Sequence, residues 1–214
     1  MTIKNIDAHG VLMYSNYKNF IDKYVSFSDD EWLLFTSKLT KSHHKRGEII
    51  HCVGDICTKL MFINSGIIRG YFIDENGKDY TKNICFNDHH SQMINRYVVD
   101  YDSFINKKSS KISFEVLEDC ELFSINYHDL QFLYQHSHMC ERFARLMAEE
   151  AYSYVHNVMV DKLEKTASQR FEEFMAKTPY LLDKVPQYHI ATLLGIAPQS
   201  LSRLKKLKKS NLCE

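Results

Sequence analysis

The sequence predicts an α+β protein built from three successive parts: an antiparallel β domain, one long helix and a short helical domain. Four glycines, spaced 7, 12 and 11 residues apart, separate short apolar runs in the first part: Gly47, Gly54, Gly66 and Gly77. Regular turn signals of this kind are typical of an antiparallel sandwich or barrel. Residues 137–164 contain neither glycine nor proline, and all three prolines lie within the last 36 residues. We therefore expect the parts to span residues 1–136, 137–164 and 165–214.

The composition is that of a globular protein. Of the 214 residues, 44% are hydrophobic and 25% are charged, which excludes a disordered or fibrous chain. No apolar run reaches the roughly 18 residues of a membrane helix, and the N-terminus has no run of signal-peptide length. The six cysteines are scattered and form no CxxC pair, as is usual for reduced thiols. We therefore expect a cytoplasmic protein without a membrane partner.

In the β domain, strands are expected in the apolar runs between the turn signals, at 48–53, 60–64, 67–73, 80–86, 112–116 and 121–126. Glu75-Asn76-Gly77 suits a hairpin turn, because asparagine and glycine both tolerate positive φ. Ahead of the sheet, Ser28 and Glu31 form a capping-box pattern before an apolar run that begins at Trp32. This pattern predicts a helix that packs on the barrel.

The stretch without glycine or proline predicts a helix over residues 137–164. Positions spaced alternately four and three residues apart carry only apolar side chains: Cys140, Ala144, Met147, Ala151, Tyr154 and Val158. Such a stripe is the heptad seam of a coiled coil, so we expect a dimerisation helix and a homodimer. A second stripe, of Phe143, Leu146 and Met159, is expected to face the β domain. The alternative is a single buried helix inside a globular core.

The C-terminal part contains two short helical segments joined by a glycine. The first is expected over residues 187–194, with Ala191 small enough to let the second helix cross it closely. Gly195 supplies a left-handed turn, and Pro198 suits the first position of a second helix over residues 198–208. This arrangement predicts a helix-turn-helix, a DNA-binding motif. A short helical hairpin of some other bundle is the alternative.

The charges are unevenly distributed along the chain. The 27 cations and 27 acids of the whole sequence cancel, which by itself argues against a nucleic-acid binder. From Asp161 to the end, however, ten cations face six acids, a net charge of +4, so residues 1–160 carry −4. The cations gather on and just after the second helix of the motif, where DNA phosphates would lie. The neutral total therefore combines an acidic part with a basic end that suits double-stranded DNA.

With these motifs, the chain resembles the Crp/Fnr family of bacterial transcription regulators over about residues 27–209. In the β domain the likeness is carried by Lys45-Arg46-Gly47-Glu48, Gly54-Asp55, Leu60-Met61-Phe62-Ile63-Asn64-Ser65-Gly66 and Arg69-Gly70-Tyr71. This series is specific to the family's cyclic-nucleotide-binding β-roll. Residues 167–171 and 185–191 are similar to a branch common in Bacteroidetes. The resemblance implies a sensory β-roll, dimerisation through the central helix, binding to palindromic DNA, and RNA polymerase as a further partner.

The resemblance also implies which residues contact DNA. The family places them near the start of the second helix, which here carries Gln199, Ser200 and Arg203. Glutamine reads adenine, arginine reads guanine, and serine adapts to either. Three lysines are better placed for phosphates than for bases: Lys205, Lys206 and Lys208. Pro198 stands where many relatives have a base-reading arginine, so the resemblance does not carry the family's commonest operator sequence over to this chain.

The family's cyclic-nucleotide cassette is altered in this chain. The resemblance aligns the phosphate-binding glycine with Val99, the ribose-binding glutamate with Asp100 and the phosphate-neutralising arginine with Ser110. Lys111 adjoins the lost arginine, but in a strand it should point to the other face. A phosphate would lack both its backbone nest and its guanidinium. We therefore expect no cyclic nucleotide and no other cofactor. The alternatives are a different small molecule, in a pocket marked by Asp100, Ser110 and Lys111, or no ligand at all.

Neither a metal site nor an enzyme is expected. The chain has no nucleotide-binding loop, zinc-ligand spacing or nucleophile elbow. Iron–sulfur members of the family use a cluster of N-terminal cysteines, and here no cysteine precedes Cys52. We expect Cys52 and Cys57 to fill the barrel. Haem ligation is an alternative, with His89 and His90 as the first candidates.

These patterns together predict sequence-specific DNA binding by a homodimeric transcriptional regulator. The alternative is a ligand-sensing module with weakened or lost DNA binding, because only five residues follow Lys209 and the usual β wing is short or missing. Salt-dependent DNA binding separates the two hypotheses, since phosphate contacts release counterions.

Overall fold

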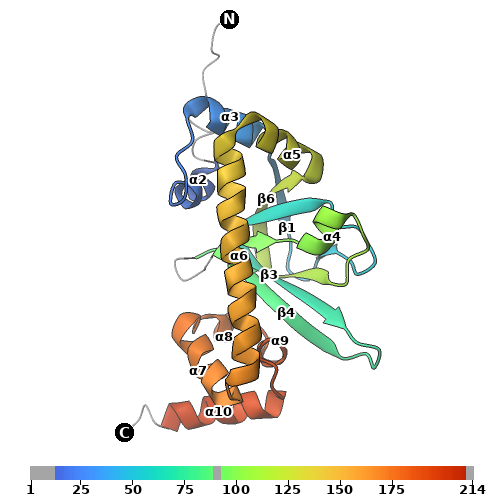
Figure 1. The fold of residues 1–214 in the computed structure, drawn as a ribbon. Helices are drawn as coiled ribbons and strands as arrows, with labels where there is room; N and C mark the ends of the chain where they lie inside the picture. Colours follow the sequence, from blue (N-terminus) through green and yellow to red (C-terminus); the bar gives the residue numbers. More distant parts are fainter. Residues whose placement is uncertain (1–12, 89–92, 211–214) are drawn as a thin grey trace, which may run out of the picture.

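The computed structural model describes residues 13–88 and 93–210 and is organised around one long helix (Figure 1). This helix, α6 (His138–Glu164), runs along the molecule with the β-sheet beside it and the C-terminal helices around its lower end. The N-terminal helices lie at the other end, next to the start of α6. The architecture confirms the predicted α+β fold class, an antiparallel β-roll followed by helices.

The strands of the described residues form one antiparallel sheet: β1 (Thr40–His44), β2 (Ile49–His51), β3 (Lys59–Ile73), β4 (Asp79–Phe86), β5 (Tyr97–Val98) and β6 (Ser113–Asn126). Strand β6 pairs with β1, β2 and β3, and β3 pairs in addition with β4 and β5. The predicted hairpin turn between β3 and β4 is confirmed. Gly77 there has a φ of +78°, and its amide donates to the Asp74 carbonyl at 3.0 Å.

The runs predicted as separate strands at 60–64 and 67–73 belong to the single strand β3. Gly66 between them lies where the register against β6 shifts, so it is a bulge and not a turn. Its φ is +96°, and a Cβ at this position would lie 2.5 Å from the Cβ of Cys120. The opposing runs at 112–116 and 121–126 are likewise joined in β6. Glycine spacing does not distinguish a turn from a bulge, because both use positive φ.

The helices of the described residues are α2 (Ser15–Ile21), α3 (Asp29–Ser37), the 3₁₀ helix η1 (Met93–Arg96), α4 (Tyr101–Asn106), α5 (Tyr127–His136), α6, α7 (Ala167–Lys177), α8 (Leu181–Lys184), α9 (Gln187–Leu194) and α10 (Pro198–Ser210). The capping box predicted ahead of α3 is confirmed. The Glu31 amide donates to Ser28 Oγ at 3.3 Å, and the Ser28 amide donates to Glu31 Oε2 at 3.0 Å. Ser137 caps α6 with its side chain alone, accepting from the Cys140 amide at 3.2 Å.

The C-terminal helices share an apolar core with the sheet. The sheet contributes Ile67, Ile84, Phe86 and Leu117, and the helices contribute Phe171, Leu181, Val185, Ile190, Ala191, Leu194 and Leu201. Burial of these side chains is the main force that holds the C-terminal helices on the β domain, at about 25 cal/mol for each Å² of apolar surface removed from water. A second cluster joins α2, α3, α5 and the start of α6 to the other end of the sheet.

The seam predicted on α6 lies largely against the chain's own core. Cys140 is 3% exposed inside the cluster at the start of α6, and Met147 and Ala151 pack against that cluster. The other three seam residues are half-buried: Ala144, Tyr154 and Val158. The expectation of a seam open to a partner along its whole length is therefore wrong at Cys140. An apolar stripe has the same periodicity whether its own sheet or a second chain covers it.

A different stripe of α6 is exposed. It consists of four large apolar residues: Tyr152, Val155, Met159 and Leu163, with exposed fractions of 77%, 60%, 58% and 83%. We refer to these four as the outer stripe. The sequence predicts that Met159 faces the β domain together with Phe143 and Leu146. Phe143 is buried and Leu146 is half-buried, but Met159 is exposed, so the expectation is wrong for Met159.

Two further sequence expectations concern cysteines and membrane helices. Cys52 is exposed in the turn after β2, so the expectation that it fills the barrel is wrong, whereas Cys57 is buried as expected. None of the helices in the described ranges is long and apolar enough to cross a membrane.

Candidate nucleic-acid interface

Helices α9 and α10 form the helical pair joined by a glycine that the sequence predicts. Gly195 has a φ of +67°, and its amide donates to the Thr192 carbonyl at 3.1 Å. The Ile196 amide donates to the Ala191 carbonyl at 2.9 Å. These bonds satisfy carbonyls at the end of α9 and reverse the chain direction. Ala191 is fully buried, which agrees with a close crossing of the two helices.

Helix α7 holds the turn between α9 and α10. Its Arg170 donates from Nε to the Leu194 carbonyl at 2.9 Å and from Nη1 to the Lys165 carbonyl. The neighbouring Phe171 is 2% exposed and belongs to the same apolar cluster as Leu201 of α10. Sequence reasoning missed Arg170, because a single arginine on a helix carries no signal of a carbonyl 24 residues away.

Three of the predicted DNA-contacting residues share one exposed face of α10. Gln199, Arg203 and Lys206 follow one another at steps of four and three residues, and all three are exposed. We refer to them as the reading face. On the other side of α10, Leu201 is fully buried and Leu204 packs against the same cluster. The structure thus presents a polar, cationic face of α10 to solvent while the apolar face holds the helix in place.

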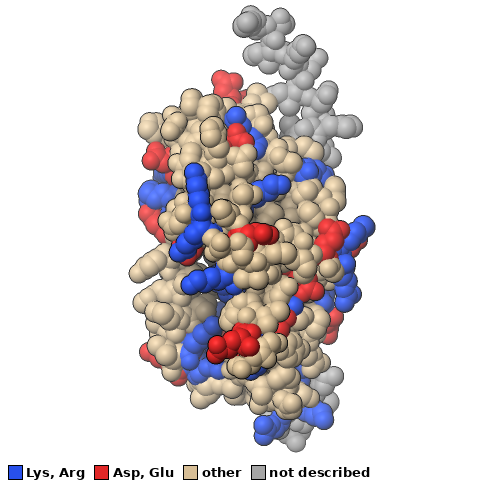
Figure 2. All heavy atoms as spheres, turned by 90° about the vertical axis from the view of Figure 1, so that its right-hand side faces the viewer, with Lys and Arg blue, Asp and Glu red and all other residues tan. Residues whose placement is uncertain are grey.

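The remaining predicted DNA-contacting residues are placed differently. Ser200 and Lys205 are half-buried beside the reading face. Lys208 lies within α10, but its side chain is outside the described part of the structure. Residues 198–210 include no acidic residue, so α10 is positively charged along its length. Figure 2 shows cationic side chains at the lower end of the molecule, the end at which Figure 1 places α10.

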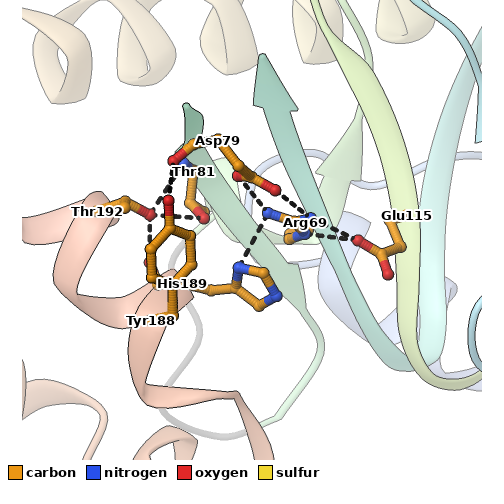
Figure 3. Close-up of polar contacts among 7 residues, drawn as sticks. All are labelled: Arg69, Asp79, Thr81, Glu115, Tyr188, His189 and Thr192. Carbon is orange, nitrogen blue, oxygen red and sulfur yellow. Dashed lines mark hydrogen bonds and ion pairs between the residues drawn. The ribbon is translucent and has the colours of Figure 1, made fainter. Parts of the chain in front are cut away.

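A polar cluster docks α9 onto the sheet (Figure 3). At its centre is Arg69 of β3, which is 4% exposed. Its guanidinium donates to both carboxylate oxygens of Asp79 at 2.7 and 2.8 Å and to Glu115 Oε2 at 2.7 Å. Arg69 Nη1 also lies 3.0 Å from Nδ1 of His189 on α9. Because arginine only donates, His189 must accept through Nδ1.

Two further contacts of α9 complete this cluster. Thr192 Oγ1 accepts from the Thr81 amide and donates to Thr81 Oγ1, both at 3.1 Å. Tyr188 donates to the Asp79 carbonyl at 3.0 Å. We call these seven residues the Arg69 cluster: Arg69, Asp79, Thr81, Glu115, Tyr188, His189 and Thr192.

The electrostatic setting of His189 follows from this docking. Burial lowers the pKa of His189 from its ordinary value of 6.5, and the nearby Arg69 charge lowers it further, against the opposing effect of Asp79 and Glu115. A neutral imidazole that accepts from Arg69 is therefore the form that the docked structure requires.

The residues predicted to mark a ligand pocket are brought together only in part. Ser110 Oγ donates to Asp100 Oδ2 at 2.7 Å, and both residues are buried. The Ser110 carbonyl accepts from the Gly54 amide at 2.9 Å, which ties the pair to the neighbouring turn. Lys111, the third of these residues, is exposed, whereas the other two are buried. The serine and aspartate, which the resemblance aligns with the family's phosphate and ribose contacts, thus bond to each other.

A pocket of about 300 Å³ lies elsewhere, between α2, the end of β4 and η1. It is lined by Asn16, Asn19, Phe20, Lys23, Asn64, Asn87, Asp88 and Arg96, and none of the three predicted ligand residues lines it. His89 and His90, the haem candidates, lie outside the described residues. Within the described ranges, no three histidine, cysteine or acidic residues group in a way that could hold a metal ion.

No family model matches this sequence, and no curated protein matches it. Solved structures do match over most of the chain. A putative Crp/Fnr-family transcriptional regulator from Eubacterium rectale has a TM-score of 0.65 at 18% identity, covering 92% of this chain and 88% of that one. FixK2 from Bradyrhizobium japonicum has a TM-score of 0.66 at 14% identity, with coverages of 81% and 85%.

A third structure is CLP, the c-di-GMP responsive global regulator of Xanthomonas campestris. Its TM-score is 0.60 at 16% identity, covering 86% of this chain and 94% of that one. At these identities the likeness establishes the fold, a β-roll, a long helix and C-terminal helices arranged as in Crp/Fnr regulators.

Proposed function

We propose that the chain is a transcriptional regulator of the Crp/Fnr family that binds DNA through α10. The observation that carries this proposal is the exposed reading face of Gln199, Arg203 and Lys206 on the second helix of the α9–α10 pair. Its supports are the fold shared with proteins described as transcriptional regulators and the absence of acidic residues from α10. In this arrangement Gln199 and Arg203 read base edges while Lys206 contacts a phosphate.

The proposal includes a homodimer formed through α6. The outer stripe supports it, because four large apolar residues at steps of three, four and four lie exposed along one face of a long helix. Two copies packed through these faces bury the stripe and place two copies of α10 at the same end of the assembly. Each α10 then enters the major groove of one half-site, about 34 Å from the other.

The proposal further states that cyclic nucleotides do not regulate this protein. The support is the buried hydrogen bond between Ser110 and Asp100, which occupies the groups that would face a phosphate and a ribose. Val99 in place of glycine and the lack of a cation in the same buried position give a phosphate no anchor.

The direct test is an electrophoretic shift of promoter fragments with the full chain. We expect Arg203→Ala to lose about 1–3 kcal/mol of discrimination between the preferred site and random DNA, the usual contribution of a bidentate base contact. Arg46→Ala removes an exposed arginine from the β domain and is the matched control, expected to bind like the wild type. Equal binding of wild type and Arg203→Ala to every sequence would remove the assignment of base recognition to α10.

A further inference from the structure

We propose that the Arg69 cluster positions the DNA-binding helices, so that its residues determine which spacing of half-sites the protein accepts without touching DNA. This inference rests on the proposed function, since it concerns how two copies of α10 are held relative to each other. The residues involved lie on β3, β4, β6 and α9, and none lies on α10.

The apolar contacts between the C-terminal helices and the sheet do not fix an orientation by themselves. Apolar burial is non-directional, and a smooth contact tolerates small rotations at little cost. The bonds of the Arg69 cluster are directional. Arg69 engages Asp79 through two nearly parallel bonds of 2.7 and 2.8 Å, and this bidentate geometry specifies the plane of the guanidinium.

The fixed guanidinium in turn specifies where α9 lies. His189 accepts at 3.0 Å from the same nitrogen that binds Asp79, and Thr192, one turn further along α9, bonds to Thr81 of β4. Two attachment points on one helix determine both its position and its rotation about the sheet normal. Breaking a buried polar contact leaves the partner unsatisfied, so an alternative docking orientation that misplaces these groups is disfavoured.

This docking leaves the reading face accessible. Gln199 and Arg203 are exposed while α9 is docked, and α10 is joined to α9 by the short turn at Gly195 that Arg170 holds through Leu194. A change in the orientation of α9 is therefore transmitted to α10 as a rigid movement. In a homodimer, a tilt of α10 changes the distance between the two recognition helices. The spacing of half-sites that the protein prefers on DNA reports this distance.

The experiment compares His189→Lys with His189→Gln in the full chain. Lysine places a second cation against Arg69, whereas glutamine keeps an acceptor and is the matched control. Docking is followed by amide exchange in the peptide that contains Thr81, because the Thr81 amide donates across the interface to Thr192. Positioning is followed by affinity for operators in which one or two base pairs are added to or removed from the spacer.

We expect His189→Lys to raise exchange at Thr81 and to lower the preference for the best spacer about tenfold, a typical size for coupling between two sites. His189→Gln should keep the wild-type spacer preference. A purely structural role would weaken binding to all spacers equally. If His189→Lys prevents folding, Thr192→Val, which is isosteric and removes one attachment point, is expected to relax the spacer preference by itself.

Increased exchange at Thr81 with an unchanged spacer preference would overturn the proposal. So would an unchanged exchange rate in folded His189→Lys, because the cluster would then not hold α9. Failure of the proposed function is a distinct outcome, in which the wild type binds no operator at all while the Thr81 amide remains protected from exchange. The Arg69 cluster would then be a structural contact without a role in DNA binding.

Discussion

At the residue scale, Gly66 allows β3 and β6 to continue as single long strands past a shift of register. Its φ of +96° is in a region that side chains rarely adopt, and Cys120 lies opposite at a distance that leaves no room for a Cβ. Gly47 has a similar φ of +89°, but no atom lies within 4 Å of its Cβ position. A comparison of the two positions therefore separates the effect of backbone strain, present at both, from the effect of close approach, present only at Gly66.

We expect Gly66→Ala to lower the free energy of unfolding by about 3 kcal/mol, because strain and a backbone clash with Cys120 and Asp119 act together. Gly47→Ala, with strain alone, should lower it by only about 1 kcal/mol. Urea denaturation of both variants checks this difference. Equal losses would show that the bulge relaxes to accept a side chain.

At the element scale, α6 carries two apolar faces on different sides of one helix. Its inner face, which includes Cys140 and Met147, is covered by the chain's own core, and its outer stripe is exposed. A long helix with apolar residues on two sides needs two partners, and the described part of the chain covers only the inner face. A second copy of the chain is the partner that the proposed function requires.

Replacing Val155 by aspartate introduces a charge into the middle of the outer stripe, so we expect it to convert the proposed dimer into a monomer. Sedimentation velocity at a fixed protein concentration measures the change. His156→Asp alters the adjacent exposed position outside the stripe and serves as the control, expected to remain dimeric. A Val155→Asp chain that sediments as a dimer would place the interface on another face.

At the scale of the whole molecule, the β domain and the C-terminal helices are joined by apolar burial and by the Arg69 cluster. Docking requires neutral His189, whose pKa is lowered below its ordinary value of 6.5, first by burial and then by Arg69. The facing charged groups are Arg69, Asp79 and Glu115. Undocked or unfolded His189 takes up a proton as the pH falls below 6.5, while the docked residue resists protonation.

The contribution of His189 to stability is therefore fully present above pH 6.5 and is lost as the pH falls from 6.5 through the lowered pKa of the docked residue. His51 also has a lowered pKa, so the wild type alone does not isolate this effect. As the pH falls from 7.5 to 5.5, we expect the unfolding free energy of the wild type to decrease relative to that of His189→Gln, because glutamine does not titrate. Urea denaturation at a series of pH values checks this, and a difference independent of pH would contradict it.

The sequence by itself determined the features that depend on neighbouring residues. The Ser28 capping box, the Gly77 hairpin turn, the long helix, and the helices that meet at Gly195 are all present as expected. Each arises from backbone preferences and hydrogen bonds within a few residues, so a local pattern is sufficient to specify it. The exposed positions of Gln199 and Arg203 follow similarly from the periodicity of one helix.

Only the tertiary structure decided which surfaces meet. The bond between Asp100 and Ser110 joins residues 10 positions apart, and the docking of His189 onto Arg69 joins residues 120 positions apart. The covered face of α6 and the continuation of β3 and β6 past Gly66 likewise depend on contacts between remote segments. Periodicity shows that a face is apolar but not what covers it, and a polar residue carries no signal of a distant partner. The physical reason is that burial and directional bonds between remote segments depend on the packed arrangement of the whole chain.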